Sequence, residues 1–95
     1  MKKYRAKSEV IETISFEELV NHVIESGAHL HNGMPWSFSY QGKAITHEND
    51  DMYLFLTPHG FEKFSRGSFL GVKENGELFS CDENFLNTYY DKVED

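Results

Sequence analysis

The stretch from residue 15 to 28, SFEELVNHVIESGA, constrains the fold most, because it carries the clearest helix signal in the chain. Ser15 followed by Glu18 is a capping box, which marks the start of a helix. Gly27 stands where a helix-terminating glycine belongs. Between them, apolar side chains recur at helical spacing: Phe16, Leu19, Val20, Val23 and Ile24. The pattern predicts one amphipathic helix of about three turns that packs its apolar face on a sheet.

Around this helix, short alternating runs bounded by turn residues predict antiparallel strands. Residues 4–14 predict one edge or half-buried strand. In residues 36–40, WSFSY, alternation places three rings on one face of a strand. Gln41–Gly42 predicts a tight turn with the glycine at positive φ, returning to a partner strand at residues 43–47.

The second half of the chain continues this pattern. Residues 52–57, MYLFLT, predict a central strand, and Asn75–Gly76 predicts the turn of a hairpin over residues 68–81. The remaining segments are predicted as a boundary at residues 29–36, a helical turn carrying Phe61 and Phe64, a short turn capped by Asp82, and a last strand at 87–93. We therefore expect an α+β fold, with one amphipathic helix on a mostly antiparallel, strongly twisted sheet of six or seven short strands.

Length and composition predict a single domain spanning residues 1–95. Hydrophobic residues make up 39% of the chain, and eight Phe, five Tyr and one Trp supply the large rings that a small core needs. No apolar run approaches the roughly 20 residues that span a bilayer, and no secretory signal follows the basic start, so no membrane partner is expected. The single cysteine, Cys81, excludes an intrachain disulfide and favours a reducing compartment, which predicts a cytoplasmic location.

The net charge of −7 is unevenly distributed. Lys2, Lys3, Arg5 and Lys7 lie within the first seven residues, whereas the other 88 residues hold five basic and all sixteen acidic side chains. Binding to nucleic-acid phosphates needs a basic face, so this distribution disfavours nucleic acid as a partner. An acidic body indicates either a basic protein partner or simple solubility.

Two histidine-containing segments have the atoms of a metal site. His47–Asp51 holds an imidazole and three carboxylates, but neighbouring strand residues point to opposite faces, so the preferred interpretation is a solvated turn. His29 and His31 share a face in an extended segment and would need a third ligand such as His47 or His59. His22 falls off the apolar stripe of the helix and is expected at the surface. No metal or other cofactor is predicted.

Catalytic motifs give no positive support for an enzyme. The sequence contains no phosphate-binding glycine loop and no nucleophile elbow. Cys81 stands beside Asp82, which disfavours a thiolate, so a buried inert thiol is expected. The stripe of Trp36, Phe38 and Tyr40 could stack bases or line a pocket, but it more often packs under a helix. A mixed arrangement, with Phe38 in the core and Trp36 at an exposed rim, is also open.

Both ends of the chain resemble a family of small phage and prophage proteins. The opening pattern is carried by Met1, Lys2, Tyr4, Arg5, Lys7, Ile11, Glu12 and Phe16, with Ser8 where those proteins usually have proline. The closing pattern is carried by Gly71, Val72, Gly76, Glu77, Cys81, Phe85, Thr88 and Tyr89. The resemblance implies a phage accessory protein acting in the host cytoplasm. It brings no catalytic residues, and many small phage proteins bind and disable a host enzyme.

Two binding functions and one enzymatic function follow as hypotheses. The first is a protein that inhibits a host factor, such as a CRISPR or restriction nuclease of anti-phage defence. Its candidate contacts are Trp36, Glu48, Asn49, Asp50, Asp51 and Tyr90. The alternative is a binder, expected as an oligomer, that sequesters a nucleotide immune signal with Lys2, Lys3, Arg5, Lys7, Lys43 and Arg66. A metal-dependent enzyme at the histidines comes third.

Overall fold

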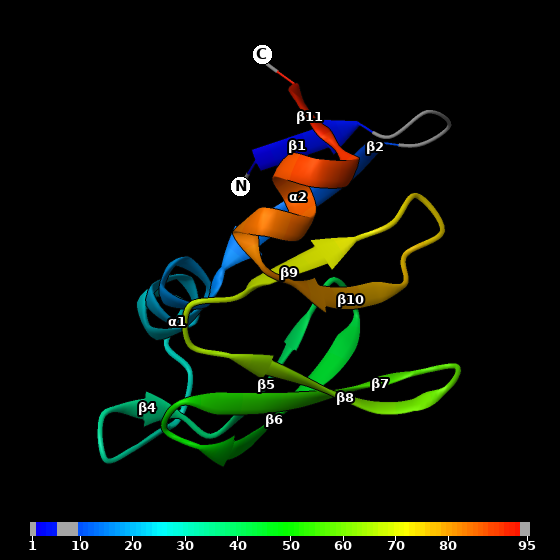
Figure 1. Cartoon of the computed structure of the whole chain (residues 1–95). Coiled ribbons are helices and arrows are strands. Elements are labelled where there is room, and N and C mark those ends of the chain that lie inside the picture. The colour runs from blue at the N-terminus through cyan, green and yellow to red at the C-terminus, as the bar shows by residue number, and fades with distance from the viewer. Residues whose placement is uncertain (1, 6–9, 94–95) are drawn as a thin grey trace.

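The larger of the two main sheets has five antiparallel strands in the order β10-β9-β2-β1-β11 (Figure 1). The structure is a computed structural model, which describes residues 2–5 and 10–93. The strands of this sheet are β1 Lys2–Arg5, β2 Val10–Ser15, β9 Phe69–Val72, β10 Leu78–Cys81 and β11 Asp91–Val93. Strands from the two ends of the chain thus pair directly, since β1 lies between β2 and β11.

The second main sheet is a meander of four antiparallel strands in the order β5-β6-β7-β8. Its strands are β5 Ser37–Tyr40, β6 Lys43–Asn49, β7 Met52–Thr57 and β8 Gly60–Ser65. The turn between β5 and β6 has positive φ at both Gln41 (53°) and Gly42 (76°), which suits the twist of a two-residue hairpin. The predicted central position of residues 52–57 is confirmed, because β7 lies between β6 and β8.

Helix α1, Phe16–Glu25, follows β2 directly and packs between the sheets (Figure 1). The predicted capping box is present: Ser15 Oγ accepts the Glu18 N–H and the Glu18 carboxylate accepts the Ser15 N–H, both at 3.1 Å. The predicted stripe is buried except at its edge, where Ile24 is 36% exposed. The Phe16 ring lies 5.7 Å from the Tyr53 ring and 5.4 Å from that of Phe64. This contact joins the helix to the four-stranded sheet.

The main core draws on α1 and on both sheets. Ile14, Leu70 and Leu78 come from the five-stranded sheet, whereas Ile45 and Phe55 are fully buried residues of the four-stranded sheet. Because side chains alternate along a strand, the other face of the five-stranded sheet carries Ile11 and Phe69, and helix α2, Glu83–Tyr89, covers that face. Both faces of the larger sheet are therefore covered.

The strand-rich α+β class is confirmed, but the element count is higher than predicted, with two helices and eleven strands in the described residues. Residues 4–14 do not form one strand, because β1 and β2 pair as separate neighbours. The expected boundary at residues 29–36 contains a short hairpin of β3 Leu30–His31 and β4 Met34–Pro35. Asn32 and Gly33, both at positive φ, form its turn.

Two further predictions of secondary structure are wrong. The helical turn expected near Phe61 and Phe64 is strand β8, whose pairing with β7 sends the two rings to opposite faces. Of the last strand predicted at residues 87–93, only Asp91–Val93 is a strand, because residues 87–89 belong to the helix that Asp82 caps. Neither helix of the described residues is long and apolar enough to span a membrane.

Candidate functional site

The ring of Trp36 is exposed and is also held by contacts with two histidine rings. It is 47% exposed, and it stacks on the His47 ring with centroids 4.8 Å apart. His31 makes an edge contact with the same indole at 4.9 Å. The Trp36 backbone is also held, since its N–H donates to His29 O and its carbonyl accepts the His47 N–H. The indole is therefore fixed in one position while much of its surface stays open.

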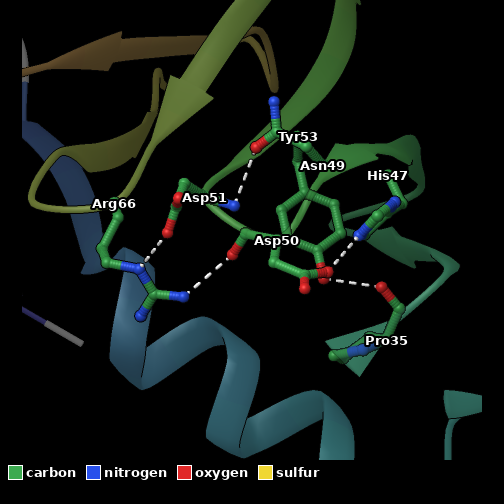
Figure 2. A network of polar contacts seen from close by, with 7 residues as sticks. All are labelled: Pro35, His47, Asn49, Asp50, Asp51, Tyr53 and Arg66. Atoms are coloured by element: carbon green, nitrogen blue, oxygen red, sulfur yellow. Dashed lines mark hydrogen bonds and ion pairs between the residues drawn. The ribbon is translucent and has the colours of Figure 1, made fainter. Parts of the chain in front are cut away.

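His47 and Tyr53, whose rings pack against each other, each make a separate polar contact (Figure 2). His47 Nε2 lies 3.1 Å from Asp50 Oδ1, and the His47 side chain is only 8% exposed against 62% for Asp50. The Tyr53 hydroxyl donates to Pro35 O at 2.6 Å in a buried hydrogen bond. Burial, with a smaller contribution from the charge of Asp50, raises the pKa of Tyr53 to about 12. Tyr53 therefore stays protonated and able to donate over the neutral range.

The turn between β6 and β7 is held by hydrogen bonds of its own. Asn49 Oδ1 accepts the Asp51 N–H at 2.8 Å, as expected for a turn of this composition. The pairing register shifts between His47 and Asn49, so Glu48 is the extra residue of a β-bulge. This bulge turns the exposed Glu48 away from the regular alternation of the strand.

Arg66 connects this turn to α1. Its Nε donates to Asp51 Oδ1 at 2.7 Å and a terminal nitrogen donates to Asp50 O at 2.8 Å (Figure 2). The other terminal nitrogen lies 3.7 Å from Glu17 Oε1, and the guanidinium sits over the Phe16 ring. The hydrogen bond to Asp51 raises the pKa of Arg66, with further contributions from nearby carboxylates. The Asp51 charge is thus paired with Arg66, whereas the Asp50 side chain contacts His47 and is 62% exposed, and Glu48 is exposed.

We call the surface formed by His31, Trp36, His47, Glu48 and Asp50 the Trp36 face. Of the six partner contacts proposed from the sequence, Trp36 and Asp50 both contact His47 here, whereas Glu48 and Asn49 are placed near them only by following His47 in β6. Asp51 lies beside it but is committed to Arg66. Tyr90 belongs elsewhere, since it is half-buried against the cluster of Tyr4, Ile11 and Leu86 under α2. Tyr90 is therefore not part of this surface.

The cations proposed for a nucleotide ligand lie on different elements. Lys2, Lys3 and Arg5 are on β1, Lys43 begins β6, and Arg66 follows β8. Lys7 lies outside the described residues. Of these groups, Arg66 already contacts the carboxylates of Asp51 and Glu17.

Metal ligands do not gather in the part of the chain that the structure describes: no group of three or more His, Cys, Asp or Glu side chains could hold an ion there. His29 and His31 share the segment before and within β3, but His31 contacts Trp36 instead of a further ligand. His22 is exposed on α1, as predicted. Cys81 is half-buried rather than buried as expected. Burial, and to a lesser extent the charge of Asp82, raises the pKa of Cys81 to about 11, which disfavours the thiolate.

Sequence reasoning missed one exposed apolar surface. Leu56 and Phe61 are paired across β7 and β8, and they are 62% and 71% exposed. The apolar run MYLFLT had been predicted as a central strand without an assignment of its two faces, and Phe61 had been expected on a helical turn. The register of β8 against β7 was the missing information.

Compared with known proteins, the chain matches no protein-family model, no curated protein and no solved structure.

Proposed function

We propose that this protein is a binding module that inhibits a host factor, and that the Trp36 face is its contact surface. The observation that carries the proposal is a half-exposed indole stacked on His47, whose imidazole contacts the exposed carboxylate of Asp50. Glu48, also exposed, follows His47 in β6. Tryptophan is enriched among the residues that contribute most to protein interfaces. Because the ring is already held, little conformational freedom is lost when a partner covers it.

The charge of this surface favours a basic partner. Glu48 and Asp50 lie outside the Arg66–Asp51 pair, and the chain as a whole carries a net charge of −7. Complementary charge accelerates encounter and selects among partners, more than it raises final affinity. A nucleic-acid-binding enzyme, which needs a positive surface for phosphates, fits this requirement. The resemblance to small phage proteins supports a defence nuclease of the CRISPR or restriction type as the class of target, reached in the host cytoplasm.

The test is capture of partners from a bacterial lysate by the tagged protein, with retained proteins and released small molecules identified by mass spectrometry. We expect one stoichiometric protein partner, whose activity falls when the purified chain is added. A bound nucleotide without a protein partner would instead support the sequestration alternative. In that case the basic residues, not Trp36, would be the site to mutate.

Two variants test whether the partner contacts the Trp36 face. Trp36→Ser removes the indole, and Glu48→Lys reverses an exposed charge whose side chain has no ion pair in the described residues. Lysine at Asp50 or Asp51 is a less clean probe, because it also breaks the His47 or Arg66 contact. Glu83→Lys on α2 makes the same charge change away from this surface and is the matched control. Equal capture by all three variants would contradict the proposal.

A further inference from the structure

Strand β5 forms one edge of the four-stranded sheet, and it lacks the charged residues and prolines that usually keep edge strands from pairing with other chains. The other edge strands of the two main sheets are different. Strand β8 carries Glu62 and Lys63, and β11 carries Asp91 and Lys92. Strand β10 is tied to β8 by Ser80 Oγ, which donates to Lys63 O at 2.7 Å. Strand β5 is therefore the least protected edge of the main sheets.

The backbone of Ser37 and Ser39 points away from β6. Tyr40 and Lys43 flank the two-residue turn, and residues in that position exchange both of their backbone hydrogen bonds. Because hydrogen-bonded pairs alternate with pairs that are not, the N–H and C=O groups of Ser37 and Ser39 lie on the outer side of β5. Both serines are exposed, and within the described residues these groups form no hydrogen bond to another strand. They are available to pair with an added strand.

The surroundings of this edge are acidic. A hollow of about 470 Å³ at the end of β5 is lined by Tyr40 and Gln41. Two carboxylates of α1, Glu18 and Glu25, line it as well, and no residue of β6 does. At its other end, β5 begins directly after Trp36 and so adjoins the Trp36 face with the exposed carboxylate of that surface. A strand laid along β5 therefore meets negative charge near both of its ends.

We propose that the partner binds as an extended strand that adds to the edge of β5, with basic side chains at every second position. Side chains alternate along a strand, so cations at this spacing share the face on which Trp36 and Tyr40 lie. Strand addition takes its affinity from backbone hydrogen bonds and its specificity from the alternate side chains. A second copy of β5 is disfavoured, because it would bring the same carboxylates with it.

This inference rests on the proposed function for the existence of a basic partner, and it adds the way in which that partner binds. The probe is a synthetic peptide of alternating lysine and valine, blocked at both ends and about seven residues long, which is the length of one strand. Titration of the ¹⁵N-labelled protein with this peptide should shift the amide resonances of Ser37 and Ser39 and slow their hydrogen exchange. The same peptide with glutamate in place of lysine is the control and should not bind.

Two variants test the backbone and the charge separately. Ser39→Pro removes an outward N–H that takes no part in the pairing with β6, so it should weaken peptide binding by about tenfold without unfolding the chain. Ser39→Ala keeps that N–H and should bind as the wild type does. Glu25→Lys should weaken binding by about threefold or more, whereas Glu83→Lys on α2 makes the same charge change elsewhere and should not.

Three results would overturn the inference. The first is a peptide that leaves the amides of Ser37 and Ser39 unchanged. The second is binding that tolerates Ser39→Pro or, should that variant fail to fold by circular dichroism, binding that tolerates Glu25→Lys. The third is a chain that associates with itself through β5 in the absence of peptide, which would make a second copy the occupant.

Lysate capture separates this inference from the proposed function. A partner that Ser39→Pro captures as well as the wild type does would overturn the inference alone. Equal capture by the Trp36→Ser, Glu48→Lys and Glu83→Lys variants would instead contradict the proposed contact surface, and the peptide titration would still decide whether β5 accepts a basic strand.

Discussion

The Trp36 face and the Leu56–Phe61 pair both expose a large ring, but they differ in what holds that ring. Trp36 contacts His31 and His47, and the support of His47 continues through Tyr53 into the core. Phe61 has no comparable aromatic contact among the described residues. The Trp36 ring is thus held by other rings of its own chain, whereas, among the described residues, the Phe61 ring is not. The exposed fractions of the two rings do not by themselves reveal this difference.

The largest effect is expected at Phe16, which supports the Trp36 face from below through Tyr53 and Arg66. Phe16→Ala should lower the free energy of unfolding by about 3–5 kcal/mol, because a fully buried ring leaves a cavity. Urea denaturation of both proteins measures the difference. A loss below about 1 kcal/mol would show that α1 does not anchor this surface.

The second largest effect is expected at alkaline pH, which should lower the free energy of unfolding by ionising Tyr53. The pKa of Tyr53 is raised from 10.0 to about 12, so its contribution is complete below pH 10 and is lost as the pH rises towards 12. The full loss is about 3 kcal/mol, since each pKa unit corresponds to about 1.4 kcal/mol. Urea denaturation at a series of pH values measures it. Cys81→Ser is the background for this experiment, because that thiol also titrates from pH 9.0 upward.

Tyr53→Phe should cost about 1–3 kcal/mol at neutral pH, because the buried Pro35 carbonyl loses its donor. The variant should also lose less stability than the wild type between pH 10 and 12, and the loss that remains is expected from Tyr40, whose pKa is also raised by burial. Thermal unfolding at both ends of this range tests the two statements together. An unchanged alkaline transition would mean that another group is responsible.

The smallest changes in stability are expected at Trp36 and Phe61, and comparing them distinguishes the two surfaces directly. Trp36→Ala should cost about 1 kcal/mol, because it removes ring contacts with His31 and His47. Phe61→Ala should change stability by less than about 0.5 kcal/mol. Equal costs for the two substitutions would remove the distinction between a supported and an unsupported ring.

The features predicted correctly from the sequence are local ones. The Ser15–Glu18 capping box and the Gln41–Gly42 turn depend on residues within a few positions of each other, and both are present. The rim position of Trp36 beside Pro35 was one of the alternatives, and its 47% exposure agrees with it. Such features follow from backbone preferences and side-chain capping, which need no knowledge of the rest of the fold.

The features that were not predicted from the sequence depend on contacts between residues that are far apart in the chain. Arg66 reaches Asp51 across 15 residues, and this contact removes Asp51 from the set of free carboxylates. The burial of Tyr90 depends on α2 packing over Tyr4 and Ile11. The exposure of Phe61 depends on the register of β8, and a shift of one residue would exchange its face with that of Phe64. Register and docking of this kind are set by the assembled core.

The central claim is that a partner covers Trp36, and the chain offers a direct probe because it contains one tryptophan. Protein labelled with 5-fluorotryptophan should give one ¹⁹F resonance. Titration with the purified partner should shift or broaden that resonance in proportion to complex formation, and Glu48→Lys should move the titration to higher concentration. A complex that forms at full stoichiometry and leaves the resonance unchanged would contradict the account.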